Sequence, residues 1–279
     1  MKKKLRFGFS SCPNDTFIFY ALVNNKIDTL GFDFDFIIKD VEELNNMAIA
    51  NEIDITKISF NAYGKVSQRY VLSNHGSALG KNNGPLVIAL QQFAIGELKN
   101  KKIAIPGVNT TANLLLSIAF PEVKDKKEYL FSDIEKAILS KEVDAGLIIH
   151  ETRFTYMNKG LKKIMDLGEW WETQYKLPLP LGGICVSRNL PNEQVLAIDY
   201  LIGQSIEYAF ENPQETYKFI KHYAQDTSDR VIRNHIDLYV NEFTRELGSL
   251  GKKSIRFLLE SGKQQGFFSS LPDKLFVGE

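Results

Sequence analysis

The chain has 279 residues, with 34 basic and 34 acidic side chains, and 44% of its residues are hydrophobic. This charge balance argues against a nucleic-acid partner, because nucleic-acid binding needs an excess of positive charge. The apolar content also excludes a disordered chain. At this length the chain is expected to form one large packed unit or two smaller ones.

The first residues predict no export signal. Three lysines follow Met1, as in a secretory signal, but serine, proline and polar residues interrupt the sequence before a long apolar stretch develops. No apolar run approaches the roughly 20 residues that span a bilayer. Cys12 and Cys185 are too few for a disulfide framework or a zinc cluster. We therefore expect a cytoplasmic protein with two reduced thiols and no membrane insertion.

The first ninety residues alternate between strand and helix patterns. The run "KLRFGFS" predicts a buried strand, and "DTFIFYALVNNK" predicts a helix capped by Asp15 or Thr16. The stretches "FDFDFIIKD", "VEELNNMAIAN" and "IDITKISF" then predict strand, helix and strand. This alternation favours a largely parallel sheet with helices on its faces.

A second set of elements repeats the plan. A strand is expected from Lys102 to Ile105, with a helix from Thr110 or Thr111, and "KEYLFSDIEKAILSKEVDAGLIIHE" predicts strand, helix and strand. The segment "LPLPLGGICVSRNLP" reads as a crossing, and helical patterns follow it. We expect an α/β fold with an interlobe cleft, in which residues 1–90 and 181–279 form the first lobe and residues 91–180 the second.

Four polar segments follow predicted strands and lead into helices or turns. They are "SSCPNDT", "SFNAYG", "PGVNTTA" and "HETRF". Ligands of open α/β sheets lie beyond the carboxyl ends of the strands, where helix amino termini attract anions. Hydroxyl and amide groups suit a carboxylate or a polyol better than a metal. For "SSCPNDT" and "PGVNTTA", helix capping alone is an alternative explanation, and it stays open.

The sharpest single candidate is His150, because it follows the apolar run "DAGLII" at the edge expected to face the cleft. A histidine there could exchange a proton near neutral pH, or it could make a structural hydrogen bond. His75 lies in a glycine-rich turn and is read as an ordinary loop histidine that could line the site. His222 and His235 lie in helical patterns and are expected to take no part in the chemistry.

Lys57 stands between apolar neighbours in "DITKISF". It either extends its amine to the strand edge or meets an anionic ligand. Cys12 is a minor alternative as a nucleophile at a helix entry, where the helix dipole would lower its pKa. The sequence contains no glycine-rich phosphate loop, no nucleophile elbow and no histidine pair at metal-ligand spacing on a helix.

Together the motifs resemble one family. The stretches "SSCPNDTFIFYAL", "DITKISFNAY", "IPGVNTTANLLL", "DAGLIIHETRFTY" and "YVNEFTRELGSLGKKSI" are similar, in this order and along nearly the whole chain, to 1,4-dihydroxy-6-naphthoate synthases of the futalosine route to menaquinone. The resemblance implies a fold like that of type II periplasmic binding proteins. It also implies a lyase that converts cyclic dehypoxanthinyl futalosine, a small carboxylated substrate, into 1,4-dihydroxy-6-naphthoate and dihydroxyacetone without a metal or organic cofactor.

The same resemblance implies roles for particular residues. The family's base is a histidine in the motif matched by "GLIIHETRF", which is His150 here. The residues implied in substrate binding are Lys57, Ile58, Ser59, Thr111 and Ala112, with Asn14 and Asp15 as further cleft positions. Ser11 replaces a proline that is common in the family's "CPND" loop, which bears on loop rigidity more than on chemistry.

Two other functions fit the same fold. Chorismate dehydratase of the same pathway also handles a carboxylated ring, but "CPND" together with "GLIIHE" favours the naphthoate synthase. A solute-binding protein of a transporter would also fit, although it normally requires export. No oligomeric state is predicted.

Overall fold

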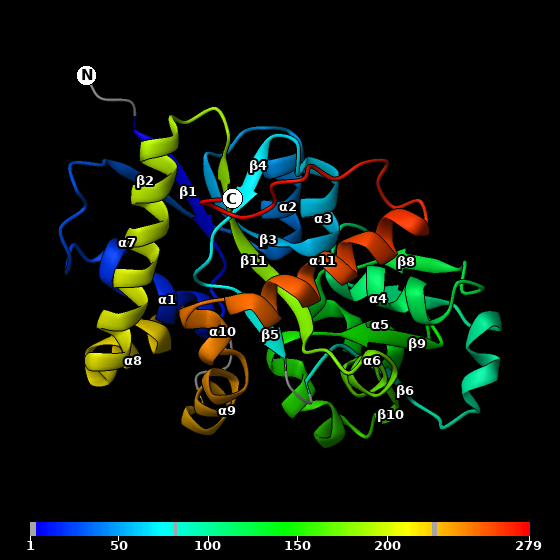
Figure 1. The fold of residues 1–279 in the computed structure, drawn as a ribbon. Helices are drawn as coiled ribbons and strands as arrows, with labels where there is room; N and C mark the ends of the chain where they lie inside the picture. The colour runs from blue at the N-terminus through cyan, green and yellow to red at the C-terminus, as the bar shows by residue number, and fades with distance from the viewer. Residues whose placement is uncertain (1–3, 81–82, 225–227) are drawn as a thin grey trace.

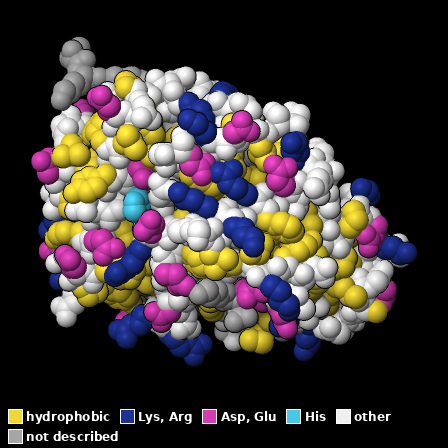
Figure 2. Space-filling view, in the orientation of Figure 1, with side chains coloured by type: hydrophobic (Ala, Val, Ile, Leu, Met, Phe, Trp, Pro, Cys, Tyr) yellow, Lys and Arg dark blue, Asp and Glu magenta, His cyan; other side chains and the backbone are white. Residues whose placement is uncertain are grey.

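The computed structural model describes residues 4–80, 83–224 and 228–279, and it leaves the side chains of His150 and Glu151 undescribed. Its chain forms two mixed β-sheets with helices packed around them (Figure 1). No helix within the described ranges is both long and apolar enough to cross a membrane. On the face in Figure 2, basic and acidic side chains are interspersed with apolar ones.

The first sheet consists of β1 (Leu5–Phe9), β2 (Phe34–Ile38), β3 (Ile55–Ser59), β4 (Tyr70–Leu72), β5 (Ala78–Gly80) and β11 (Leu179–Ser187). β1 lies between β2 and β3 and is parallel to both. β11 runs antiparallel to β3 on one side and to β4 and β5 on the other. β3 is buried along its whole length, although only Ile55 and Ile58 of its five residues are apolar.

The second sheet consists of β6 (Leu86–Ala89), β7 (Ile103–Ile105), β8 (Lys126–Glu128), β9 (Ala145–Ile148) and β10 (Lys162–Asp166). Its strand order is β10-β6-β9-β7-β8. β7 is parallel to β8 and β9, whereas β6 is antiparallel to β9 and β10. The expected strand at Lys102 to Ile105 is thus confirmed, one residue shorter.

The helices from the first and last parts of the chain are α1 (Pro13–Val23), α2 (Val41–Ile49), α3 (Phe60–Val66), α7 (Asn192–Glu211), α8 (Pro213–Tyr223), α9 (Asp229–Tyr239), α10 (Glu242–Arg245) and α11 (Gly248–Gln264). The expected cap of α1 at Asp15 or Thr16 is wrong. The N-cap is Cys12, because Pro13 starts the helix at its first position, where proline needs no backbone N–H. Asp15 instead lies in the first turn.

The helical segments of the middle part are η1 (Ile95–Asn100), α4 (Thr111–Ala119), η2 (Phe131–Asp133), α5 (Ile134–Leu139), η3 (His150–Phe154), η4 (Tyr156–Lys159) and α6 (Leu167–Tyr175). The predicted start of α4 is confirmed. Thr110 is its N-cap, and the Thr110 hydroxyl accepts a hydrogen bond from Asn113 N at 3.3 Å.

The chain passes between the sheets twice. It leaves the first sheet between β5 and β6, and it returns to the first sheet between β10 and β11. The sequence places residues up to 90 in the first lobe, but β6 belongs to the second sheet. A run as short as Leu86–Ala89 has no periodicity that distinguishes one sheet from the other. The division into domains at residues 90 and 180 stays a prediction.

One buried apolar cluster extends across both sheets. On the side of the first sheet it includes Leu44 in α2 and Phe60 in α3. On the side of the second sheet it includes Leu147 in β9 and Trp171 in α6. Helix α11 lies over the junction and packs against α3, α4 and β11 (Figure 1). Because the core is continuous, the two sheets are held against each other along one side of the molecule.

Packing at this junction is tight at Gly64 in α3. A Cβ atom at Gly64 would overlap the ring of Phe268, which follows α11. We expect Gly64→Ala to lower the free energy of unfolding by about 1–3 kcal/mol through overpacking, although alanine favours helix. Gly96→Ala is the control, since a Cβ there meets nothing within 4 Å. Urea denaturation compares the two, and equal stability would contradict the packing argument.

Candidate active site

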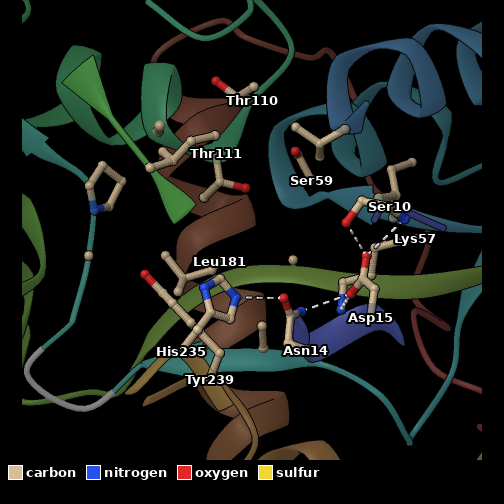
Figure 3. A pocket seen from close by; sticks show the side chains of 18 residues that line it. Ser10, Asn14, Asp15, Lys57, Ser59, Thr110, Thr111, Leu181, His235 and Tyr239 are labelled. Carbon is tan, nitrogen blue, oxygen red and sulfur yellow. Dashed lines mark hydrogen bonds and ion pairs between the residues drawn. The ribbon is translucent and has the colours of Figure 1, made fainter. Parts of the chain in front are cut away.

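A cavity lies between the two sheets (Figure 3). The empty space within it is about 740 Å³, including the part that is open to solvent. The residues that line it are Ser10, Asn14, Asp15, Val41, Lys57, Ile58, Ser59, Ala78, Gly84, Pro85, Thr110, Thr111, Ala112, Ile149, Leu181, Gly182, His235 and Tyr239.

All seven positions expected to contact a substrate line this cavity. They are Asn14, Asp15, Lys57, Ile58, Ser59, Thr111 and Ala112. They meet because β1 and β3 are parallel neighbours, so the segments after both strands lie at the same edge, and α4 faces them from the other sheet. Their part in binding stays a prediction.

One side of the cavity contains a buried ion pair. Lys57 Nζ lies 2.9 Å from Asp15 Oδ1 and also donates to the carbonyl oxygen of Gly76 at 3.0 Å. The other oxygen of Asp15 accepts from the backbone N–H and the hydroxyl of Ser10, at 3.1 and 2.7 Å. Lys57 therefore neither extends to solvent nor presents an uncompensated charge, because a carboxylate of the protein balances its ammonium.

His235 joins this polar group and lines the cavity, and that it takes no part in the chemistry stays a prediction. Its Nε2 lies 2.9 Å from Asn14 Oδ1, and Asn14 Nδ2 donates to Asp15 Oδ1 at 2.8 Å (Figure 3). Since the Asn14 oxygen can only accept, His235 Nε2 carries the proton of this hydrogen bond. The two residues are 221 positions apart, so no local pattern connects them.

The opposite side is formed where α3 and α4 meet. The backbone N–H of Phe60, the first residue of α3, donates to Thr111 Oγ1 at 2.8 Å. Ser59 precedes α3, and its hydroxyl oxygen accepts from Asn45 Nδ2 at 3.1 Å. The N–H groups of Thr111 and Ala112 belong to the first turn of α4, where a helix supplies no acceptor. This arrangement of hydroxyls and N–H groups suits an anionic oxygen.

His150 follows directly after Ile149, which lines the cavity. Its backbone begins η3, and η3 packs against α9, the helix of His235 and Tyr239. The side chain of His150 lies outside the described part of the structure, so its role stays a prediction.

The other nucleophile and base candidates lie elsewhere. Of the described residues, neither Cys12 nor His75 is among those that line the cavity. The ring of His75 contacts the carbonyl oxygen of Arg245 instead, and His222 is exposed on α8. No group of three or more His, Cys, Asp or Glu side chains within the described ranges could hold a metal ion.

The ion pair predicts a large effect of removing one partner. Asp15→Asn leaves the buried ammonium of Lys57 without its carboxylate, so the free energy of unfolding should fall by about 3 kcal/mol or more. Asp35→Asn is the control, because Asp35 pairs with Lys4 while about half exposed, and such pairs contribute under about 1 kcal/mol. Equal losses in urea denaturation would argue against the importance of the pair.

Comparison with known proteins identifies the family of this chain. A family model described as menaquinone biosynthesis matches residues 5–264. A 1,4-dihydroxy-6-naphtoate synthase of Thermus thermophilus is 40% identical over 273 residues, which cover 98% of this chain and 99% of the relative. The enzyme of that name from Streptomyces coelicolor is 35% identical, with 97% of each chain covered.

Solved structures agree on the architecture. A protein of Archaeoglobus fulgidus superposes with a TM-score of 0.87 at 35% identity, covering 95% of this chain and 98% of its own. A Candida albicans protein with the generic periplasmic binding protein fold gives a TM-score of 0.70 at 13% identity, with 98% and 93% covered. The expected α/β fold of the periplasmic-binding-protein type is therefore confirmed. The chain belongs to the family of menaquinone-biosynthesis enzymes that includes the 1,4-dihydroxy-6-naphthoate synthases.

Proposed function

We propose that this enzyme converts cyclic dehypoxanthinyl futalosine into 1,4-dihydroxy-6-naphthoate and dihydroxyacetone. One observation carries the proposal: the seven positions that the family resemblance implies for substrate binding, scattered between residues 14 and 112, all line one cavity between the two sheets. The near full-length similarity to two 1,4-dihydroxy-6-naphtoate synthases supports it. The proposal includes a cytoplasmic location, as the sequence suggests.

In this proposal the substrate's carboxylate binds where α3 and α4 meet. The hydroxyl of Ser59 donates to it from one side, and the first-turn N–H groups of Thr111 and Ala112 donate from the other. The hydroxyl-bearing part of the substrate lies toward Asn14, Asp15 and Lys57, where amide, carboxylate and ammonium groups can pair with hydroxyls. The substrate thus contacts both sheets at once.

His150 acts as the general base. In its neutral form it removes a proton next to a carbonyl group of the substrate, and cleavage of a carbon–carbon bond then releases the three-carbon product. The remaining bicycle becomes aromatic, which drives the reaction. The protein has to position the base, hold the carboxylate and exclude water while the lobes enclose the substrate.

The proposal is tested by incubating purified protein with cyclic dehypoxanthinyl futalosine and following 1,4-dihydroxy-6-naphthoate by absorbance and mass. The wild type should form product. His150→Ala should lower kcat by about 10²–10⁴-fold, the typical contribution of a positioned base. The control is His222→Ala, which replaces an exposed histidine of α8 and should leave kcat unchanged.

Two results would overturn parts of the proposal. Near wild-type kcat in His150→Ala would remove the base assignment while leaving the reaction in place. If wild-type protein forms no product, chorismate is the next substrate, and its dehydration would assign the alternative activity in menaquinone biosynthesis. Turnover of neither would favour a ligand-binding role for the cavity.

A further inference from the structure

A buried carboxylate outside the cavity connects the two segments that form the α3–α4 side of the cavity. Glu42 lies in the first turn of α2 and is only 7% exposed. Its carboxylate accepts hydrogen bonds from Asn45 on its own helix and from Asn109 of the second sheet's surroundings. No step proposed for the reaction uses it, so its burial calls for another explanation.

Toward the first sheet, Glu42 acts through Asn45. Asn45 Nδ2 donates to Glu42 Oε2 at 3.0 Å and to the hydroxyl oxygen of Ser59 at 3.1 Å. Asn45 Oδ1 accepts from the backbone N–H of Ser59 at 2.9 Å. Asn45 is fully buried, and its side-chain amide binds both the backbone N–H and the hydroxyl oxygen of Ser59. Because the Ser59 oxygen already accepts a bond, its hydroxyl proton is available to donate into the cavity.

Toward the second sheet, Glu42 acts through Asn109. Glu42 Oε1 accepts from the backbone N–H of Asn109 at 3.0 Å and from its side-chain amide at 2.8 Å. Asn109 directly precedes Thr110, the N-cap of α4. Lys65 Nζ donates to Asn109 Oδ1 at 2.6 Å, which fixes the orientation of the amide. The bonds therefore set the position of the turn that leads to Thr111 and Ala112.

Only a carboxylate satisfies this arrangement. The three groups that face Glu42 are N–H donors, and an ionised carboxylate is a pure acceptor. Burial raises the pKa of Glu42, and the hydrogen bonds from Asn45 and Asn109 oppose that rise. Gly107 provides the space, because a Cβ atom there would lie 2.5 Å from the carboxyl carbon of Glu42. The chain thus brings its backbone close to this carboxylate at a position with φ of 148°.

We propose that Glu42 is a positioning residue that holds Ser59 and the turn before Thr111 and Ala112 at the separation that a carboxylate ligand requires. The inference rests on the proposed function, since it assumes that these residues bind the substrate's carboxylate. Glu42 itself does not touch the substrate. It affects the binding of the substrate's carboxylate by positioning hydrogen-bond donors that follow strands of two different sheets.

Binding of 2-naphthoate and of 2-naphthamide, measured by calorimetry, tests this role without turnover. The wild type should bind the naphthoate more tightly than the uncharged amide. In Glu42→Gln, the Kd for 2-naphthoate should rise about tenfold, because an amide leaves one buried donor unpaired and moves the donors apart. The Kd for 2-naphthamide should not change. Glu43→Gln removes a charge from the same turn of α2 at an exposed side chain and should leave both values unchanged.

The outcomes separate this inference from the proposed function. If wild-type protein does not prefer 2-naphthoate, the carboxylate site is wrong and the role of Glu42 falls with it. If the wild type prefers it and Glu42→Gln keeps the full preference, only the positioning role is overturned. A merely structural role would lower the melting temperature of Glu42→Gln without changing the ratio of the two Kd values. If Glu42→Gln does not fold, Asn109→Ala takes its place. This variant keeps the backbone N–H that binds Glu42, so its Kd for 2-naphthoate should rise by a smaller factor.

Discussion

The hydrogen bond from the backbone N–H of Phe60 to Thr111 Oγ1 is the contact on which the site depends. The first N–H groups of a helix have no acceptor within it, and here the first residue of α4 supplies one to the first residue of α3. Because these helices follow strands of different sheets, the bond brings two helix amino termini together. The cavity that lies between them therefore exists only when both sheets are packed.

A second constraint comes from burying charge beside that cavity. Lys57 and Asp15 are both almost fully buried, and each charge also needs hydrogen bonds to offset the loss of water. Ser10, Asn14 and the carbonyl oxygen of Gly76 supply them. Asp15 also lies in the first turn of α1, where the helix dipole favours a negative charge. The polar side of the cavity is thus ordered before any ligand arrives, which lowers the cost of binding.

Local signals in the sequence were sufficient for most of the elements. The start of α4 at Thr110 or Thr111 is predictable because a threonine before an apolar helix is a signal contained within a few residues. The predicted start of α1 is wrong because Asp15 suits both an N-cap and the first turn of a helix. Only the backbone shows that the helix begins at Pro13, which places Asp15 in the first turn. His235 was missed because its partner Asn14 is distant in the chain. Glu42 gave no signal either, since its pattern is that of an ordinary capped helix.

By itself, the sequence determined the α/β class, the order of strands and helices over residues 5–59 and 103–148, and three polar segments that line the cavity, at Asn14, Ser59 and Thr111. Periodicity and capping are properties of neighbouring residues, so they can be read locally. Its motifs also led to the correct family. Only the tertiary structure decided which sheet β6 joins, that Lys57 is paired with Asp15, and that Glu42 in α2 binds Asn109 before α4. These features are contacts between distant segments, and their energies depend on burial and geometry that arise only when both sheets are packed together.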